Sequence, residues 1–582
     1  MATSLINSDS LLAVDIGSVK TRALLFDVID GRYRFLASGT GNTTLGPPIY
    51  DPGDGVRKAI SNLSDVTGRT FLDKDGNLVT PTKTDNTGID SFALTISAGI
   101  PLKVIAVGLV QEVSVRSARH LAEATYSKIV STLSLDDKRT QEARIDTILK
   151  FRPDLIIIAG GIEGGESASI SKLFEAVGLA CFLLPRSQRP QIIYAGNQQL
   201  QKEAEESLAV VGGLHIAPNI RPSWEVESLA PAQKTLVDVF RKLRTSKSIS
   251  LRELDNWSKG KMMPTSVAFE RIIRVLSKIY DPAKGVLGID LGASSATIVS
   301  AFNGKSTIGV YPHFGMGQSI PEVLRRSKVE EITRWLPFEI SPDEVMDFLH
   351  NKTAYPNSVP MTPEDLVVEQ AIIRQTLRTL VRRISYSFPD NGNQTGPVIL
   401  PPFEPIMVAG NAITKTPPGQ CMLMLLDGLQ PTGVTTILLD QNSLVSALGA
   451  SAEINPILAV QVLGSNTVQN LGTVIAPVGS ARISVPILQG QITYTDGSES
   501  LFEVKFGTIE ALPLTLGEKA TLKLQPLHRF NIGMGPGRGG TLQVVGGTLG
   551  IVIDARGRPI PQPLDPAKQR RLRKQWLQIL GN

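Results

Sequence analysis

The chain has few cysteines, few histidines and no long apolar run, and each scarcity excludes a class of protein. Among 582 residues there are only two cysteines, Cys181 and Cys421, each inside an apolar segment. A disulfide framework and a cysteine metal cluster are therefore excluded. The five histidines show no spacing typical of metal ligands. No stretch approaches about 18 uninterrupted apolar residues, so we expect no transmembrane segment. The N-terminus lacks a basic region followed by an apolar one, which predicts a cytoplasmic protein without a signal peptide.

The positive charge of the chain is concentrated at its C-terminal end. The formal net charge is +5, and the segment 566–582 carries five cations and no acidic residue. The rest of the chain is therefore neutral, which argues against a general affinity for nucleic acid. We expect this segment to form a helix that docks onto the protein itself; a membrane surface and an acidic partner are the alternatives. The cations are Lys568, Arg570, Arg571, Arg573 and Lys574.

The length and the patterning predict several α/β domains. A chain of this length is expected to form about three to four domains. Strands alternate with helices in the first part, which indicates α/β layers with largely parallel pairing, whereas short alternating strands near the end predict a separate small β domain. The predicted units are a first lobe with insertions (1–221), a helical connection (222–284), a second lobe (285–479), the small β domain (480–563) and the basic helix (564–582).

Two segments that begin about 275 residues apart share one pattern, Leu11–Asp27 and Val286–Phe302. Each consists of an apolar strand, an Asp-X-Gly turn with small hydroxylated residues, and a second apolar strand. In such a hairpin the aspartate ends a buried strand, and the exposed amides and hydroxyls of the turn can face an anion. The alternative is two unrelated turns. Because the flanking strands also match, we favour a bilobed ATPase in which each lobe offers one hairpin to nucleotide phosphates.

The residues of the hairpins suit phosphate chemistry with a magnesium ion. Asp15 and Asp290 would hold Mg²⁺ through its water shell, because Mg²⁺ dehydrates reluctantly and prefers a few carboxylates plus phosphate oxygens. Lys20 would neutralise charge on the phosphate. Glu112 follows a predicted strand and is a candidate to orient an attacking water. An ordinary helix-stabilising carboxylate is the alternative interpretation of Glu112.

A predicted helix at 363–384 combines an apolar face with a row of arginines. Thr362 with Pro363 and Asp365 forms a helix-start signal. The arginines lie largely outside the apolar face, so we expect a solvated or salt-bridged surface. They are Arg374, Arg378, Arg382 and Arg383.

The order of the motifs resembles that of the actin, Hsp70 and sugar-kinase superfamily. After the two hairpins come an adenosine-type segment, Ile406–Thr414, and a connecting segment, Ser443–Pro456. More narrowly, the chain resembles the glutamate mutase L (MutL) family. The stretches that carry this resemblance are LLAVDIGSVKTRALLFD, RFLASGT, PDLIIIAGGIEGG, IIYAGN, MPTSVAFERII, LLDGLQPTGVTTILLD, SALGASAEINP and NLGTVIAPVG.

The resemblance implies a fold, a function and a set of site residues. The fold would be a bilobed actin-like ATPase with duplicated ribonuclease-H-like domains, followed by the small β domain. The protein would bind ATP and Mg²⁺ and serve as a reactivating chaperone of an adenosylcobalamin-dependent mutase, whose subunit would be its partner; a homodimer is a further expectation. The nucleotide-site residues would be Asp15, Gly17, Ser18, Lys20 and Thr21 in the first hairpin, Asp290, Gly292, Ala293 and Ser294 in the second, and Gly410 and Asn411 beneath the adenosine.

Two departures from the family pattern leave the rate of hydrolysis open. The adenosine segment reads Ala409-Gly410-Asn411 where paired glycines are usual, and Ala293-Ser294 replaces a glycine or threonine pair. Both favour binding over rapid turnover. Two alternative functions therefore remain, a scaffold that binds nucleotide without rapid hydrolysis and a small-molecule kinase of the same superfamily.

Overall fold

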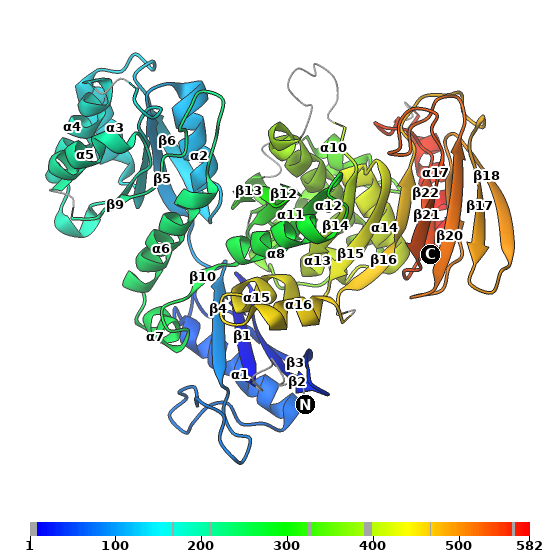
Figure 1. Cartoon of the computed structure of the whole chain (residues 1–582), viewed down its shortest axis with the longest axis horizontal. Coiled ribbons are helices and arrows are strands. Elements are labelled where there is room, and N and C mark those ends of the chain that lie inside the picture. Colours follow the sequence, from blue (N-terminus) through cyan, green and yellow to red (C-terminus); the bar gives the residue numbers. More distant parts are fainter. Residues whose placement is uncertain are drawn as a thin grey trace, which may run out of the picture.

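A computed structural model describes most of the chain, and the described residues form four β-sheets (Figure 1). Within the part that is described, no helix is long and apolar enough to cross a membrane. The described residues are 9–165, 168–209, 212–317, 319–322, 328–388, 399–465, 467–561 and 565–581.

The first lobe is a five-stranded sheet in the order β10-β4-β1-β2-β3. Strand β2 runs antiparallel to both β1 and β3, whereas β4 runs parallel to both β1 and β10. Helix α1 packs on β2 and β3. The strands are β1 (Leu11–Ile16), β2 (Lys20–Ile29), β3 (Arg32–Asn42), β4 (Ser91–Ile96) and β10 (Met263–Pro264), and α1 spans Pro52–Thr67.

A second, wholly parallel sheet is inserted into this lobe, in the order β6-β5-β7-β8-β9. Its central strands β5 and β7 are nearly continuous apolar runs because helices cover both faces. Figure 1 shows the insertion standing apart from the rest of the first lobe. The strands are β5 (Leu102–Gly108), β6 (Ser127–Leu133), β7 (Leu155–Ala159), β8 (Gln191–Tyr194) and β9 (Leu214–Ile216). The helices are η1 (Gln111–Val115), α2 (Arg116–Ala122), α3 (Gln141–Phe151), α4 (Ala168–Leu183), η2 (Arg186–Gln188), η3 (Gln198–Leu200) and α5 (Gln201–Leu208).

Three helices lead back from the insertion to the second lobe: α6 (Ala230–Ser246), α7 (Ile249–Trp257) and α8 (Thr265–Ile279). Helix α8 packs on the sheet of the second lobe and also against α15 (Leu444–Ser451), which in turn packs on β1 and β4 of the first lobe. The two helices approach so closely that a Cβ on Gly449 would lie 1.9 Å from the carbonyl oxygen of Ala268. At the junction between the lobes, α8 therefore covers the sheet of the second lobe and α15 covers the sheet of the first lobe.

The second lobe repeats the strand order of the first. Strands β11, β12 and β13 are antiparallel neighbours, and β14 and β15 follow β11 in parallel. This repeated order is the one expected of duplicated ribonuclease-H-like lobes. The strands are β11 (Gly285–Leu291), β12 (Ala296–Phe302), β13 (Lys305–Tyr311), β14 (Phe403–Ala409), β15 (Gly433–Asp440) and β16 (Gln469–Ala476). The helices are α10 (Val329–Thr333), α11 (Pro342–Ala354), α12 (Pro363–Ile384), η5 (Ser385–Ser387), α13 (Asn411–Thr414), α14 (Pro418–Leu429) and α16 (Pro456–Leu463).

Local chemistry sets the start of α12, as the sequence predicts. The Thr362 hydroxyl accepts a hydrogen bond from the Asp365 amide, and the Asp365 carboxylate accepts one from the Thr362 amide. This reciprocal capping box satisfies two amides that the helix itself leaves without partners. Pro363 occupies the first turn, where its missing N–H costs nothing.

The region 480–563 shares a sheet with the second lobe, which differs from the predicted separate β domain. A four-stranded antiparallel sheet, β18-β17-β20-β21, lies beside the lobe, but β22 pairs parallel with β16 and β19 pairs antiparallel with β22. The alternating pattern predicted the strands correctly but could not show which sheet each joins. The strands are β17 (Pro486–Tyr494), β18 (Glu499–Lys505), β19 (Ile509–Leu512), β20 (Lys519–Pro526), β21 (Gly540–Val545) and β22 (Ile551–Asp554).

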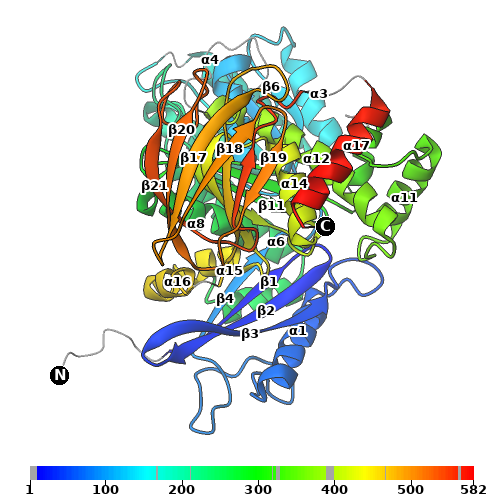
Figure 2. The same cartoon turned by 90° about the vertical axis from the view of Figure 1, so that its right-hand side faces the viewer.

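The basic helix α17 (Pro566–Ile579) docks onto the protein itself, as the first of the three expectations proposed. It packs against α14 and β19 (Figure 2). Trp576 of this helix and Leu580, which follows it, are buried. Lys568, Arg571 and Lys574 are exposed, whereas Arg573 is buried.

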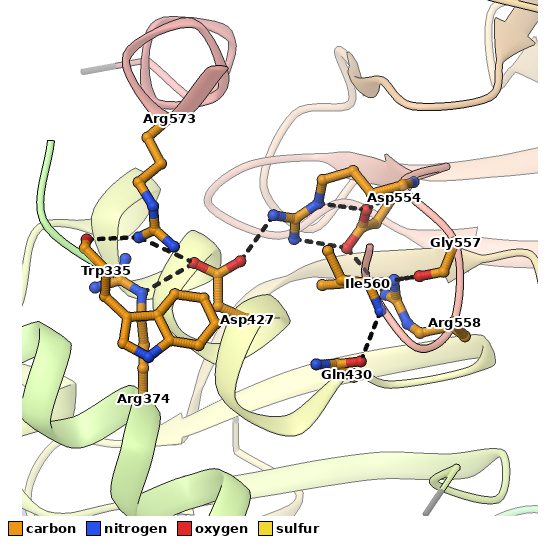
Figure 3. Close-up of polar contacts among 10 residues, drawn as sticks. Trp335, Arg374, Asp427, Gln430, Asp554, Gly557, Arg558, Ile560 and Arg573 are labelled. Carbon is orange, nitrogen blue, oxygen red and sulfur yellow. Dashed lines mark hydrogen bonds and ion pairs between the residues drawn. The ribbon is translucent and has the colours of Figure 1, made fainter. Parts of the chain in front are cut away.

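The arginine row of α12 is not simply a solvated surface. Arg374 is 3% exposed, and its Nε donates to Asp427 Oδ2 at 2.9 Å. Arg556 donates to the other Asp427 oxygen at 2.7 Å, and Arg573 of α17 donates to the carbonyl oxygen of Trp335 at 2.7 Å (Figure 3). Arg374 therefore belongs to a buried ion network that joins α12, α14 and α17.

Candidate functional site

The two lobes enclose a cavity of about 380 Å³. Ligand pockets commonly have volumes of about 300–1,000 Å³. Both Asp-X-Gly hairpins line this cavity, and so do residues 409–412 after β14 and residues 356–360 after α11. The cavity therefore lies where the duplicated hairpins predict a shared ligand.

The two hairpins have the same local geometry. The Gly17 amide donates to the carbonyl oxygen of Lys20 at 3.1 Å, and the Gly292 amide donates to that of Ser295 at 2.9 Å. Each glycine stands two residues after the aspartate and three before its acceptor. In both copies the aspartate is the second-last residue of its strand. In the register of the hairpins, Asp15 lies opposite Arg22 and Asp290 lies opposite Thr297. The repeated pattern in the sequence thus corresponds to a repeated turn in space.

Asp15 is fixed by two hydroxyl groups at the floor of the cavity. It is 5% exposed, and its Oδ1 accepts hydrogen bonds from Thr95 Oγ1 and Thr265 Oγ1, each at 2.7 Å. Thr95 belongs to β4 and Thr265 begins α8. The carboxylate is therefore oriented by the strand beside it and by the helix that leaves the first lobe.

Asp290 and Asp440 add negative charge to the same floor. Burial and the neighbouring carboxylates of Asp15 and Asp440 raise the pKa of Asp290 to about 7. Burial also raises the pKa of Asp440, although its carboxylate accepts hydrogen bonds from the amides of Leu444 and Val445. Like charges confined in a site of low polarity resist ionisation together. A cation would relieve this repulsion.

The remaining predicted residues fall into two groups. Ser18, Lys20, Gly292, Ala293, Gly410 and Asn411 line the cavity, as do Asp15, Gly17 and Asp290. Thr21 does not line it, because its buried hydroxyl pairs with the Thr43 hydroxyl at 2.9 Å. Ser294 is also outside the cavity lining, where Ser295 stands instead. Glu112 is exposed in η1 of the insertion and does not line the cavity.

Arg22 connects the two lobes at the edge of the cavity. Its Nη2 donates to Asn411 Oδ1 at 2.7 Å, and its Nη1 donates to Ser443 Oγ at 2.6 Å. Asn411, the residue that departs from the usual paired glycines, thus supplies an acceptor that glycine lacks. Gly410 before it has φ +104, which allows the backbone to pass close to the second hairpin.

A buried ion pair stands in an otherwise largely apolar wall of the cavity. Lys352 Nζ lies 3.3 Å from Glu369 Oε1, and both residues are less than a tenth exposed. Lys352 also donates to the Ser358 carbonyl oxygen. Pro356, Val359 and Leu366 line the same wall.

The carboxylates suit a hydrated cation better than direct coordination. Across the residues that the structure covers, no group of three or more His, Cys, Asp or Glu side chains is arranged to hold a metal. Asp15 and Asp290 nevertheless both line the cavity. Mg²⁺ usually keeps several waters and binds one or two carboxylates together with substrate phosphates, so these residues fit such an ion.

Sequence reasoning missed four residues that shape the site: Thr95, Thr265, Arg22 and Asp440. Arg22 lies inside the recognised first hairpin, but its partners are 389 and 421 residues away in sequence. Thr265 lies in MPTSVAFERII and Asp440 ends LLDGLQPTGVTTILLD, two of the stretches that carry the family resemblance. Their position in those stretches was the available signal.

Two lobes with the same strand order, each facing one cavity with an Asp-X-Gly hairpin, define an α/β protein of the bilobed actin-like class. The chain belongs to the MutL protein family, whose model matches residues 11–467.

One curated relative and two solved structures illustrate these similarities. Protein MutL of Clostridium tetanomorphum is 25% identical over 302 residues, which are 51% of this chain and 59% of the relative, less than two thirds of its length. The ethanolamine utilization protein EutJ of Carboxydothermus hydrogenoformans is 11% identical, with a TM-score of 0.27 over 77% of this chain and 90% of that chain. A nucleotide-free diol dehydratase-reactivating factor is 10% identical, with a TM-score of 0.29 over 77% of this chain and 99% of that chain.

Proposed function

We propose that the protein binds Mg-ATP in the cavity between its lobes. The observation that supports this proposal is the pair of matched hairpins, Gly17 to Lys20 and Gly292 to Ser295, lining one cavity. Each hairpin would present backbone amides and hydroxyls to phosphate oxygens. Lys20, exposed on the first hairpin, would add the positive charge that phosphate binding requires.

Asp15 and Asp290 would hold the magnesium ion through water molecules. The ion would supply charge neutralisation for the phosphates and for the crowded carboxylates beside it. Thr95 and Thr265 would keep the Asp15 carboxylate pointed into the cavity. Gly410 and Asn411, which directly follow β14, would lie beneath the adenosine.

The biological role we propose is that of an accessory protein to an adenosylcobalamin-dependent mutase. Membership of the MutL family supports this role. Binding of ATP would change the position of the lobes relative to one another and alter contact with the mutase, and release of the nucleotide would reset the cycle. The mutase subunit is the proposed partner.

A nucleotide-binding scaffold with slow hydrolysis is the second candidate, and one observation favours it. Glu112, the predicted water-orienting carboxylate, is exposed in the insertion and does not line the cavity. A candidate general base must reach the attacking water within hydrogen-bond distance, directly or through one water. We therefore expect tight binding with slow turnover. A metabolite screen in which ATP is consumed only with one added compound would instead support the small-molecule kinase.

Replacing Asp15 by alanine tests the proposed site. Asp15→Ala removes the carboxylate that would hold the hydrated magnesium ion, so Mg-ATP binding should weaken by about a hundredfold, the equivalent of about 3 kcal/mol. Isothermal titration calorimetry with Mg-ATP measures the affinity.

Glu112→Gln is the matched control, because it also removes one carboxylate of the chain but one outside the cavity. Its affinity should equal that of the unaltered protein. Equal affinities of the unaltered protein and Asp15→Ala would refute the assignment of the hairpins.

Mixing experiments test the proposed partner. An adenosylcobalamin-dependent mutase that has lost activity during turnover should regain it when this protein and Mg-ATP are added. Asp15→Ala should fail to restore that activity. Equal recovery with and without the protein would remove the accessory role while leaving nucleotide binding intact.

A further inference from the structure

One guanidinium group spans the junction between the lobes. Arg22 lies on β2 of the first lobe, while its acceptor Asn411 begins α13 of the second lobe. Its other acceptor, Ser443, stands between β15 of the second lobe and α15, which packs on the first lobe. Movement of either lobe away from the other would break these hydrogen bonds.

The backbone at Ser443 is held in a costly conformation. Ser443 has φ 57 and ψ 38, a left-handed geometry that residues other than glycine adopt at a cost. Three residues before Ser443, Asp440 accepts hydrogen bonds from the amides of Leu444 and Val445 at 2.8 and 2.9 Å. The short segment between β15 and α15 is therefore held at the start of α15 by Asp440 and at Ser443 by Arg22.

We propose that Arg22 is an interlobe clamp that holds the cavity closed and that an anionic ligand in the cavity competes for its guanidinium group. Arg22 is half-buried and lines the cavity, so an entering phosphate meets the same donors that bind Asn411 and Ser443. Arginine suits both partners because its planar fork can make two hydrogen bonds at once. Only the identity of the anion rests on the proposed function.

The asparagine at 411 is the feature that makes this clamp possible. Asn411 is exposed, and the Oδ1 atom of its side chain accepts the Arg22 hydrogen bond. A glycine at that position would keep the backbone turn and lose the acceptor. Asn411→Gly therefore removes the clamp on the side of the second lobe without changing Arg22 itself.

Pulsed electron paramagnetic resonance between two spin labels measures the opening directly. The labels are placed at Asp65→Cys on α1 and Asp343→Cys on α11, both exposed positions on opposite lobes. The native cysteines, Cys181 and Cys421, are buried and should not react. Without ligand, the parent should show one narrow distance. Asn411→Gly should shift the closed-to-open ratio towards open by about tenfold, the effect expected of one charge-assisted hydrogen bond. Arg22→Gln, which loses both hydrogen bonds, should shift the ratio at least as far.

Arg57→Gln is the matched control, because Arg57 pairs with Glu253 at 2.6 Å entirely within the first lobe and its helical connection. This variant should keep the parent's distance distribution. The same distribution in Asn411→Gly as in the parent, with the variant folded by circular dichroism, would overturn the clamp. The affinity of the unlabelled parent for Mg-ATP is measured in a separate titration. If the parent does not bind Mg-ATP, the interlobe distances measured without ligand still test the clamp.

Discussion

At Gly410 the backbone of the second lobe passes close to its own hairpin. The φ of this glycine, +104, lies in the left-handed half of the map, and a Cβ there would stand 2.2 Å from the carbonyl oxygen of Leu291. Leu291 ends β11, and Gly292 begins the turn of the second hairpin. A single methyl group would thus press directly on the proposed phosphate-binding turn.

Gly410→Ala should destabilise the protein and disturb the cavity. The strained dihedral and the backbone clash should lower the free energy of unfolding by about 3 kcal/mol. Denaturant unfolding followed by circular dichroism measures that loss. Gly46→Ala is the matched control, because nothing lies within 4 Å of a Cβ at Gly46. Equal unfolding midpoints for the two variants would contradict the close approach at Gly410.

At this scale the sequence could predict residue types better than side-chain directions. Ser18 and Thr21 are both small hydroxylated residues of the first hairpin, yet only Ser18 lines the cavity. Thr21 lies within β2, and its hydroxyl is hydrogen-bonded to the hydroxyl of Thr43, the residue after β3. The strand alternation that turns Thr21 inward depends on where the turn ends, and the sequence does not mark the end of the three-residue turn 17–19.

The helices α12, α14 and α17 are joined by buried charges. Asp427 on α14 is 1% exposed and accepts hydrogen bonds from Arg374 of α12 and from Arg556. Arg556 also binds Asp554 of β22 at 2.8 Å. Burial opposes ionisation of Asp427, but the surrounding guanidinium groups outweigh it and hold its pKa below the usual range. One aspartate thus ties three separate elements together.

Asp427→Asn should lower the free energy of unfolding at about pH 7 by about 3–5 kcal/mol, because it leaves buried guanidinium groups unpaired. The ionised Asp427 stabilises the folded state above its unfolded pKa of about 3.9 and loses this effect as the pH falls towards its lower folded-state pKa. The difference between parent and variant should therefore narrow below about pH 4. Urea unfolding midpoints across this range measure it.

The exposed Asp343 of α11 provides the control for that experiment. Asp343→Asn should change the midpoint little at any pH in the range. A difference between parent and Asp427→Asn that stays constant as the pH falls would show that the carboxylate's charge is not what stabilises the network.

The burial of Arg374 illustrates what element patterns leave out. The arginines of α12 lie largely off the main apolar face, and the sequence alone predicts a solvated or salt-bridged surface without showing which arginine is buried. Arg374 is buried because α14 brings the Asp427 carboxylate to that side of the helix, 53 residues further along the chain. The capping box at Thr362, by contrast, is local and was predictable.

Neither lobe is continuous in sequence when the whole molecule is considered. The first lobe takes α15 and α16 from residues 444–463, and the second takes β19 and β22 from beyond residue 508. The duplicated hairpins could be predicted because each is local, whereas these returns could not, since an apolar strand or helix carries no signal of which sheet it covers. Boundaries drawn along the chain therefore cut through the sheets.

A fragment that ends at Gly479 should not fold into a soluble protein. It would leave the β16 edge without β22, and an exposed apolar edge strand favours aggregation. Size-exclusion chromatography of the fragment should show aggregated material in place of a monomer-sized or dimer-sized peak. A fragment ending at residue 561 is the control, because it lacks only α17 and its approach and keeps the whole sheet. A soluble 1–479 fragment with the full chain's affinity for Mg-ATP would contradict this expectation.

The position of α15 sets the order of events during synthesis. The last strand next to β1, β4, is complete at Ile96, but the helix that covers β1 and β4 ends only at Ser451. At about 5–20 residues per second, the ribosome needs tens of seconds to make the intervening chain. For that interval the face of the first lobe that receives α15 lacks its native cover. We therefore expect chaperones to bind the nascent first lobe during synthesis, long before the lobe can open or close on any ligand.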